Sequence, residues 1–274
     1  RTPLTLILGG IEDVQKSNEL SERSGISLSL ARKNARRMLT MINQLLDFRK
    51  IVKNKMELKI SRVNLVQLVE DAVEDFRETA KERHIELLFT VSRRTILVWV
   101  DLDRMESVVY NLLSNAFKFT RNGGRVEVKL TVNEQEEVAL MEVRDNGIGI
   151  PKDQQSSIFE RFHQASRSVA GQRGSGIGLS LCRDIVDLHH GEIQVESRPG
   201  EGSAFMVKLR MGNAHFGMEQ INFEPSGAVK RPELMASDYL SPESERRSDV
   251  TLPTLRVCWW WTTTASCACS CITT

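Results

Sequence analysis

The feature that most limits the folds open to this chain is a change in the spacing of its apolar residues near residue 57. Between Ser27 and Met56, apolar residues recur every three or four positions, which is the period of an amphipathic α-helix. From Glu57 to about Arg210, helical runs alternate with short runs rich in β-branched residues, which are typical of strands. The sequence therefore predicts an α+β chain, in which a helical segment precedes an α/β sandwich made of one sheet covered by helices.

The helical segment, residues 1–56, is predicted to be a hairpin of two helices. Thr2–Val14 also has helical spacing, and the polar stretch QKSNELSERSG separates it from the second helix. Because a lone hairpin cannot bury both of its apolar faces, we expect a homodimer with a four-helix bundle; the alternative is that both helices pack on their own domain. The expected contact seam consists of Ala31, Ala35, Met38, Ile42, Leu45 and Val52, interrupted by Arg49.

The α/β domain is predicted to span residues 57–211. We expect its strands in the runs ELKIS, IELLFTV, ILVWVD, RVEVKLTV, VALMEVRD, GEIQVES and SAFMVKLR. We expect its helices at Leu65–Arg83, Leu102–Thr120, Gln154–Phe162 and Ile177–His189. Residues 212–253 are rich in Pro, Ser, Glu and Arg and are predicted to be a linker, followed by a distinct tail at 254–274.

Composition excludes several classes of protein. The formal net charge of the 274 residues is +1 and both signs are interspersed, so no nucleic-acid contact is expected. No apolar run approaches the roughly 18 residues of a membrane span. Outside the tail the only cysteine is Cys182, which is typical of a reducing cytosolic compartment. The chain begins at Arg1 rather than at Met, so we expect a fragment or a processed product.

Chemistry is predicted first for the stretch NLLSNAFKFT. Asn111, Asn115 and Lys118 are spaced i, i+4 and i+7, which places them on one face of a helix. Amide oxygens are suitable ligands for Mg²⁺, and a neighbouring ammonium group would neutralise phosphate oxygens. The alternative is an ordinary solvated helix face.

A second candidate is the stretch VRDNGIGIP, in which a strand delivers Asp145 into a loop. Gly147 and Gly149 can adopt positive φ or let a flat ligand approach the backbone. A carboxylate at a strand end is a good acceptor for an exocyclic amine such as that of adenine. The alternative is a simple turn, because Asp-Asn-Gly forms turns by itself.

A third candidate is GQRGSGIGLSLCRDIV, where Gly174, Gly176 and Gly178 lead into a helix whose first N–H groups could bind phosphate. A dinucleotide-binding fingerprint would need a strand immediately before it, whereas the preceding HQASRSVAGQR is polar and is predicted to be a mobile lid. The chain also lacks the Gly-Lys-Ser/Thr of a P-loop and the catalytic loop of protein kinases.

In this order the three stretches resemble the N, G1 and G2 boxes of sensor histidine kinases, with IFERFHQ resembling the F box and RTPL the end of the H box. The resemblance covers residues 1 to about 210, and INQLLDFRK is most similar to hybrid sensors of the kind found in Bacteroides. It implies a dimerisation and phosphotransfer hairpin, followed by an ATP-binding domain of the gyrase-like superfamily. It also implies ATP and Mg²⁺ as cofactors, with Asn115 holding the metal and Asn111 as a catalytic and ATP-binding residue. Lys118 would contact a phosphate, Asp145, Gly147 and Gly149 would lie at adenine, and Gly174, Gly176 and Gly178 at the lid hinge.

The amide of Asn111 favours phosphoryl transfer over hydrolysis. Relatives in the gyrase branch have a glutamate there as general base for water, and an amide cannot accept that proton. The resemblance implies a histidine acceptor just before Arg1, so we expect no autophosphorylation of this chain, while Thr2 matches a position that supports dephosphorylation of the partner. The acid-x-Arg-Thr pattern that flanks the acceptor is lacking at His84, His163, His189, His190 and His215.

The resemblance also implies a receiver domain as partner, in cis or in trans, and a cytoplasmic location with the membrane reached only through an upstream sensor. Two alternatives stay open. One is a gyrase-like ATPase that hydrolyses ATP for conformational work. The other is a degenerate dimeric module that signals without nucleotide.

The tail CWWWTTTASCACSC has neither metal-site spacing nor an amphipathic pattern. Because tryptophan has the single codon TGG, Cys-Trp-Trp-Trp-Thr must be TGY-TGG-TGG-TGG-ACN. Read from the last base of the cysteine codon, this becomes Leu-Val-Val-Asp, which resembles the first strand and acidic pocket of a receiver domain. We therefore interpret residues 254–274 as the frame-shifted start of a receiver.

Overall fold

A computed structural model of the chain describes residues 56–161 and 176–222, together with single helical positions between residues 28 and 51. The described positions from Leu28 to Ile51 are all α-helical, as their apolar spacing predicts. The predictions made for Thr2, the first helix of the hairpin, the lid, Gly174 and the tail lie outside the described residues. In the part of the chain that is described, no helix is both long and apolar enough to cross a membrane.

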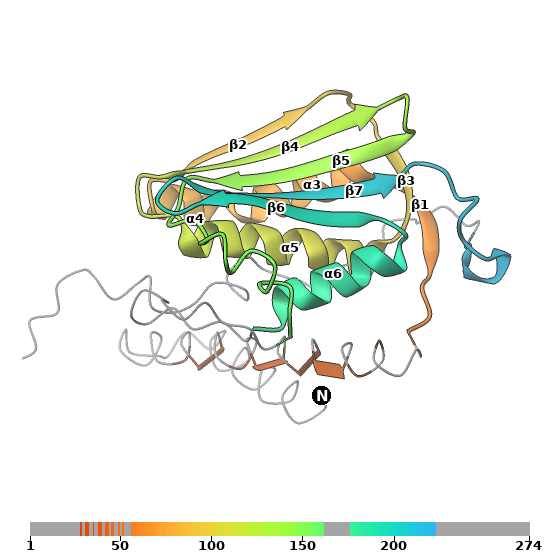
Figure 1. The fold of residues 1–274 in the computed structure, drawn as a ribbon, viewed down its shortest axis with the longest axis horizontal. Helices are drawn as coiled ribbons and strands as arrows, with labels where there is room; N and C mark the ends of the chain where they lie inside the picture. The colour runs from red at the N-terminus through yellow and green to blue at the C-terminus, as the bar shows by residue number, and fades with distance from the viewer. Residues whose placement is uncertain are drawn as a thin grey trace, which may run out of the picture. The chain divides into compact units, whose positions relative to one another are not determined.

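The centre of the α/β domain is a five-stranded sheet in the order β2-β4-β5-β7-β6 (Figure 1). Strands β2 and β4 run parallel, and the other neighbouring pairs are antiparallel. The five strands are β2 (Glu86–Val91), β4 (Arg125–Asn133), β5 (Val138–Asp145), β6 (Glu192–Arg198) and β7 (Gly202–Arg210).

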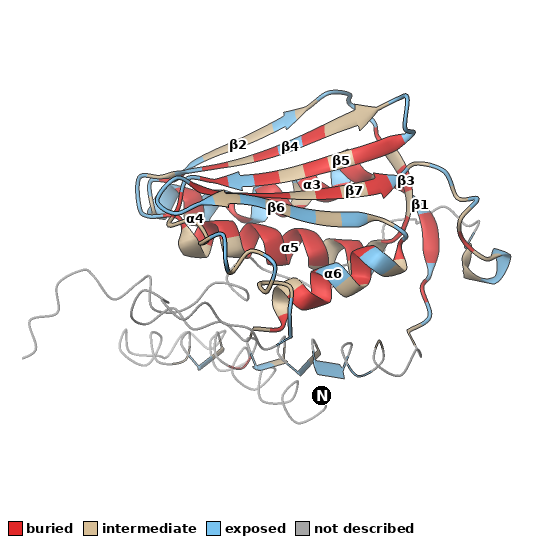
Figure 2. Cartoon of the chain, in the orientation of Figure 1, coloured by how far each residue is buried: buried red, intermediate tan, exposed pale blue. Residues whose placement is uncertain are grey.

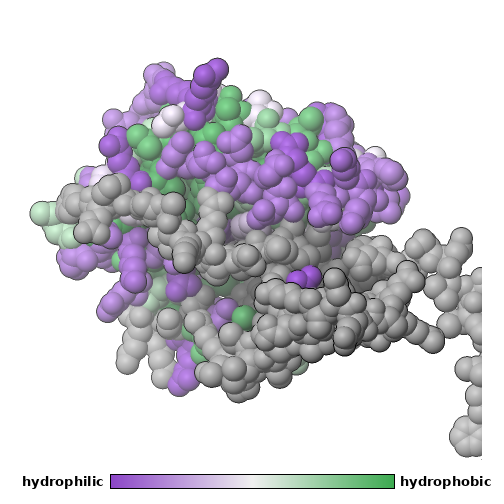
Figure 3. Space-filling view, turned by 180° about the vertical axis from the view of Figure 1, so that it is seen from behind, coloured by the Kyte–Doolittle hydropathy of each residue, from purple (hydrophilic) through white to green (hydrophobic). Residues whose placement is uncertain are grey.

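The helices cover one face of this sheet, as Figure 1 shows. They are α3 (Leu65–Asp75), α4 (Arg77–Glu82), α5 (Leu102–Phe119) and α6 (Gly178–Leu188). Figure 2 shows buried residues on the central strands and on α3, α5 and α6, with exposed residues along the edge strand β6. Seen from behind in Figure 3, hydrophilic side chains dominate the described surface. The core is therefore a single layer between the sheet and the helices, with the other face of the sheet in contact with solvent.

A second sheet differs from the prediction of a single sheet. β1 (Ile60–Asn64) pairs with β3 (Leu97–Asp101) in an antiparallel ribbon. The side-chain oxygen of Asn64 accepts hydrogen bonds from the backbone N–H groups of Val66 and Ile96, so it caps α3 and ties the ribbon to it. The ribbon does not pair with the main sheet; Val63, Val98 and Val100 attach it to the domain by packing in the main hydrophobic core.

Three other boundaries differ from the predictions. The first strand begins at Ile60 rather than at residue 57, because its register with β3 begins there. The predicted helix Leu65–Arg83 is divided at Phe76, whose fully buried ring packs 5.0 Å from that of Phe117. The predicted helix Gln154–Phe162 is wrong over its described part, which forms successive turns.

The chain remains packed beyond β7. Phe216 is buried against Leu58 and Ile60, and the backbone N–H of Asn222 donates to the carbonyl of Ile60 at 2.7 Å. A short 3₁₀ helix, η1 (Met218–Gln220), precedes that contact. The first residues of the predicted 212–253 linker therefore belong to the packed domain.

Candidate functional site

Asn111 lies in the middle of α5 and is only 7% exposed. Its side-chain nitrogen donates to the carbonyl of Ser107 one turn earlier at 2.8 Å, which fixes the orientation of the amide. Its oxygen faces the first residue of α6, because a Cβ added to Gly178 would lie 2.8 Å from Asn111 Oδ1. The amide predicted to be functional thus lies where two helices meet.

Asn115 and Lys118 follow on the same face of α5, and both are half-buried. Their neighbours Leu112, Ala116 and Phe117 are buried in the core, as the helical spacing predicts. The ammonium of Lys118 lies 5.1 Å from the ring centroid of Phe119. The polar face of α5 therefore presents two amides and one cation along one side of the helix.

Asp145 is the last residue of β5 and is 6% exposed. Its Oδ1 atom accepts a hydrogen bond from the N–H of Gly147 at 2.8 Å. Burial raises the pKa of the Asp145 carboxyl to about 6, and this effect outweighs the opposing backbone hydrogen bonds from Gly147 and Ser203. A buried carboxylate held at such a cost at the end of a strand is typical of a functional site.

The loop after Asp145 depends on two glycines. A Cβ on Gly147 would lie 2.4 Å from the carbonyl oxygen of Phe119, so the loop crosses closely over the end of α5. Gly149 has a φ of +68°, and a Cβ there would lie 1.9 Å from the carbonyl oxygen of Arg198. We refer to residues 145–151 as the 145–151 loop; it passes between the end of α5 and the β6–β7 turn.

The start of α6 forms the third part of the site. Gly176 has a φ of +68°, and the helix begins at Gly178 after Ile177, which provides no side-chain cap. Unpaired N–H groups at a helix start carry partial positive charge and suit an anion. Gly176 and Gly178 therefore lie at the turn that begins α6, while Gly174 lies outside the described residues.

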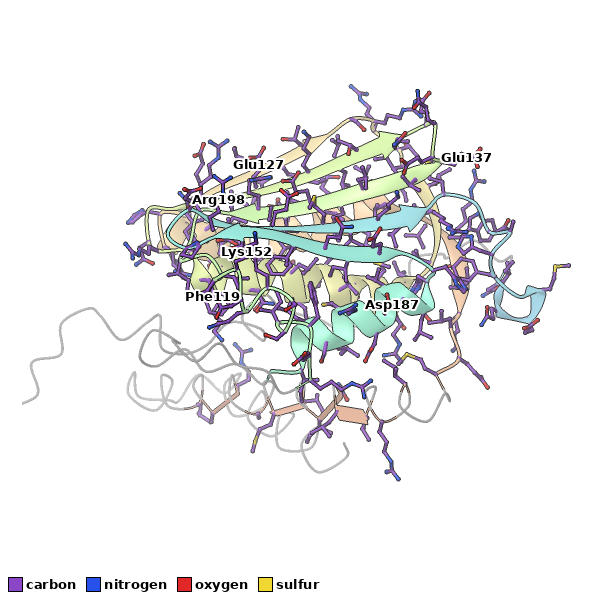
Figure 4. All side chains as sticks on the ribbon, viewed as in Figure 1. Phe119, Glu127, Glu137, Lys152, Asp187 and Arg198 are labelled. Atoms are coloured by element: carbon purple, nitrogen blue, oxygen red, sulfur yellow. The ribbon has the colours of Figure 1, made fainter. Side chains whose placement is uncertain are left out.

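The three predicted stretches meet through two close contacts, Gly147 with the Phe119 carbonyl and Gly178 with the Asn111 amide. Figure 4 labels Phe119 at the end of α5 and Arg198 at the end of β6, both at the same end of the domain as Lys152. Residues separated by more than sixty positions in the sequence thus border one region. Thr2 cannot be placed in it, because it lies outside the described residues.

Residues outside the three predicted stretches also support the 145–151 loop. Ser197 Oγ accepts from the N–H of Ile150 at 2.7 Å, and Gln155 Nε2 donates to the carbonyls of Ile150 and Ser197. Gly202 has a φ of +104°, and a Cβ there would lie 1.9 Å from the Asp145 carbonyl oxygen. Gly202 lies in a Pro-Gly-Glu-Gly stretch of a kind that forms turns, whereas Gln155 has no recognisable local pattern.

The residues present fit an adenine nucleotide. The buried Asp145 carboxylate could accept from a base, and Gly147 and Gly149 leave the loop backbone accessible to it. The half-buried Lys118 and the start of α6 are of the chemical kind that binds phosphate. The amide of Asn115 is a suitable oxygen ligand for Mg²⁺ alongside phosphate oxygens.

The sequence of this region matches a known family. Residues 100–213 match the family described as histidine kinase-, DNA gyrase B-, and HSP90-like ATPase. This range contains α5, the 145–151 loop and α6, the three parts of the site described above.

Curated relatives extend the similarity over most of the chain. The sensor histidine kinase TmoS of Ectopseudomonas mendocina is 36% identical over 256 residues, which cover 92% of this chain and 26% of TmoS. The sensor protein GacS of Pseudomonas syringae pv. syringae is 36% identical over 242 residues, covering 87% of this chain and 27% of GacS. The chain thus spans about a quarter of the length of these relatives.

Solved structures show the same architecture. Full-length ShkA in complex with AMPPNP superposes with a TM-score of 0.65 at 25% identity, covering 78% of this chain and 44% of ShkA. The catalytic domain of histidine kinase ThkA has a TM-score of 0.50 at 26% identity, covering 56% of this chain and 97% of that domain.

Proposed function

This chain contains the ATP-binding core of a two-component histidine kinase, and from that premise we propose that it transfers the γ-phosphoryl group of ATP to a histidine. The receiving histidine would lie on a dimeric helical hairpin and pass the group to a receiver aspartate. The main support for this proposal is the close approach of Asn111 Oδ1 to Gly178. This approach places the polar face of α5 next to the first residue of α6.

Asp145 is proposed to select adenine. Its buried carboxylate would accept a hydrogen bond from the exocyclic amine, and the glycines of the 145–151 loop would let the flat base approach the backbone. The N–H of Gly147 already holds one oxygen of the carboxylate in place, so the acceptor needs little reorganisation on binding.

Asn115, Lys118 and the start of α6 are proposed to hold the phosphates with Mg²⁺. The metal would neutralise charge on the phosphate oxygens, as in other phosphoryl-transfer sites. Lys118 and the N–H groups following Gly176 would supply further positive charge from the protein. Positioning of this kind accounts for most of the catalysis in phosphoryl transfer, because little covalent chemistry is asked of the protein.

The Asn111 side chain favours phosphoryl transfer to a protein acceptor over hydrolysis of ATP. Its side-chain nitrogen is engaged by the Ser107 carbonyl, and an amide has no basic site for a proton from water. The alternative of a gyrase-like ATPase therefore lacks its general base. Steady ATP hydrolysis that disappears in Asn111→Ala would support that alternative.

The described histidines lack the flanking acid-x-Arg-Thr pattern that the resemblance implies for the phosphoryl acceptor. His189 is 1% exposed and both of its ring nitrogens lie within hydrogen-bonding distance of backbone groups. His190 and His215 cluster around Phe216 instead. We propose that the acceptor belongs to the helical segment of the full protein, in a Phe-x-His-Glu-Leu stretch ahead of Arg1.

A homodimer is proposed through the helical seam. Met38, Ile42 and Leu45 are 59%, 39% and 53% exposed, which is unusual for large apolar side chains repeated at heptad spacing. A second copy of the same helix would cover them by packing side by side in a four-helix bundle.

A receiver domain is the proposed downstream partner. Histidine kinase ThkA was solved in complex with the response regulator protein TrrA, and one relative of this chain is the hybrid signal transduction histidine kinase D of Dictyostelium discoideum. The proposal of a frame-shifted receiver in residues 254–274 is tested by sequencing the encoding DNA. An uninterrupted frame through this stretch would contradict it.

Phosphorylation with radiolabelled ATP tests the proposed activity. We expect the chain to bind Mg²⁺-ATP without becoming labelled, and a chain extended by Phe-x-His-Glu-Leu ahead of Arg1 to acquire acid-labile label. Asn115→Ala in the extended chain should remove that label, whereas Asn133→Ala, at the far end of β4, should retain it. Acid-labile label on the unextended chain would show that the nucleophile is assigned wrongly.

A further inference from the structure

Arg83, between α4 and β2, binds the end of the helix that carries the site. Its Nη1 donates to the carbonyl of Phe117 at 2.5 Å and its Nη2 to the carbonyl of Thr120 at 2.6 Å. Its Nε donates to Asn122 Oδ1 at 3.0 Å, in the turn that follows α5. One side chain thus binds three acceptors around the last turn of α5.

The Arg83 side chain provides hydrogen-bond donors to carbonyl groups at the C-terminal end of α5. The last carbonyl groups of an α-helix have no partner within the helix and carry partial negative charge, which a cation satisfies well. Arginine stays protonated in proteins, although burial lowers the pKa of the Arg83 guanidinium. Its planar fork can bridge two carbonyls at a fixed separation, which the single ammonium of a lysine cannot do.

The last turn of α5 supports two parts of the nucleotide site. Lys118 lies between the two residues whose carbonyls Arg83 binds. The next carbonyl, that of Phe119, accepts a hydrogen bond of 3.3 Å from the N–H of Ile148, and Gly147 crosses closely over the same oxygen. The last turn of α5 therefore carries Lys118 and also contacts the 145–151 loop.

The backbone of Arg83 belongs to the same junction. Its carbonyl accepts from the N–H of Gly123 at 3.0 Å, and the carbonyl of Gly124 accepts from the N–H of Glu86 at 2.9 Å. The side chain and main chain of Arg83 together clamp the turn between α5 and β4. The helix end cannot shift without breaking several of these bonds.

We propose that Arg83 is a positioning residue for nucleotide binding, which fixes the last turn of α5 and, through the Phe119 carbonyl, the 145–151 loop. It would set the separation between Lys118 at the phosphates and the loop at the base. Arg83 lies outside the N, G1 and G2 stretches, and it would act through the end of α5. The inference rests on the proposed nucleotide site.

The test compares three variants of the full chain by calorimetric titration with Mg²⁺ and AMPPNP. Arg83→Met removes the donors and keeps the aliphatic stem, Arg83→Lys keeps a cation, and Arg77→Met is the matched control. Arg77 is exposed and pairs with Glu74 on the surface of the neighbouring helix. All titrations are made at a temperature where thermal unfolding curves show each variant to be folded.

We expect the Kd to rise about tenfold in Arg83→Met, because charged hydrogen bonds that align the site are lost. The rise should be about threefold in Arg83→Lys and absent in Arg77→Met. Hydrogen–deuterium exchange of the nucleotide-free protein should be faster at residues 145–151 in Arg83→Met. Exchange at these residues should be unchanged in Arg77→Met.

Three results would overturn the inference, and they have different meanings. An unchanged Kd and unchanged exchange at residues 145–151 in folded Arg83→Met would show that Arg83 serves stability alone. A wild-type chain that does not bind AMPPNP would refute the proposed nucleotide site itself, and the role of Arg83 with it. If Arg83→Met does not fold, an Arg83→Lys variant with wild-type Kd overturns the proposal, and one with weakened Kd at wild-type melting temperature supports it.

Discussion

The Nε2 atom of His189, just after α6, accepts a hydrogen bond of 2.9 Å from the backbone N–H of Asp101, at the end of β3. The other ring nitrogen, Nδ1, lies 2.8 Å from the Ile185 carbonyl and therefore carries the proton. Asp101 in turn caps α5 through Arg104 N–H and accepts from Lys59 N–H. A neutral imidazole thus joins the end of α6 to the start of α5, the two helices that carry the candidate site.

Replacing His189 by Phe should destabilise the fold by about 1–3 kcal/mol, because the buried N–H of Asp101 loses its acceptor. The free energy of unfolding from urea titration at pH 7.5 measures the loss. Gln194→Phe, at an exposed position of the edge strand β6, is the control. A stability loss no larger than that of Gln194→Phe would contradict the structural role of His189.

The same variant should change the pH dependence of stability. Burial lowers the pKa of His189 in the folded state, whereas the unfolded chain takes up its proton near the ordinary value of about 6.5. The unfolded state therefore binds more protons below that pH, so this group costs stability as pH falls through about 6.5. We expect wild type to lose more stability than His189→Phe between pH 7.5 and 5.5. Equal losses would mean that the folded protein accommodates the charged imidazole.

Asp145→Asn should remove nucleotide binding and yet stabilise the nucleotide-free protein. Ligand at about ten times Kd contributes about 1.4 kcal/mol, which shifts the melting temperature by roughly 2–4 °C. The variant should lose that shift, since an amide presents a donor beside its acceptor. Its nucleotide-free melting temperature at pH 8 should rise, because a buried charge is removed. Asp153→Asn, at an exposed position after the loop, is the control.

The pKa of about 6 for the Asp145 carboxyl also predicts how nucleotide affinity depends on pH. The raised value means that the folded state binds a proton more tightly than the unfolded chain. The stability from this group is therefore fully present below its ordinary pKa and is lost as pH rises through about 6. Nucleotide affinity should follow the opposite course, weakening below pH 6 as the acceptor is protonated. Calorimetric titrations from pH 5 to 8 measure this, and a flat affinity profile would place the adenine contact elsewhere.

Gly178→Ala should weaken nucleotide binding severalfold without unfolding the domain. The added methyl group would lie 2.8 Å from Asn111 Oδ1, so either the amide or the start of α6 must move. Alanine is itself a better helix former than glycine, so a loss of affinity without loss of stability separates the two effects. Gly212→Ala is the control, because its added methyl group meets nothing within 4 Å. Wild-type affinity in Gly178→Ala would indicate that the Asn111 contact has no part in binding.

Ile42→Glu should convert the proposed dimer into a monomer. An unpaired carboxylate at the centre of a four-helix bundle costs several kcal/mol. Sedimentation velocity measures the change, with Arg32→Glu as a control that introduces the same side chain outside the seam. A wild-type chain that is monomeric at high concentration would contradict the bundle.

The sequence by itself determined most elements of the α/β domain and indicated which residues are candidates for its site. Strand β4 and the helix carrying Asn111 follow from local spacing, because each buries one face and leaves the other more exposed. Asp145, Gly149 and Gly176 were identified because a strand-end carboxylate and positive φ leave local traces in sequence.

Only the tertiary structure decided how those elements meet. The division of the first helix at Phe76, the separate β1–β3 ribbon and the turns after residue 151 depend on partners far along the chain, which local period does not specify. The Gly178–Asn111 contact, the His189 bridge to Asp101 and the Arg83 clamp on α5 each join residues more than thirty positions apart. A side chain such as that of Arg83 has no local pattern, because its role comes from the carbonyl groups that folding brings within its reach.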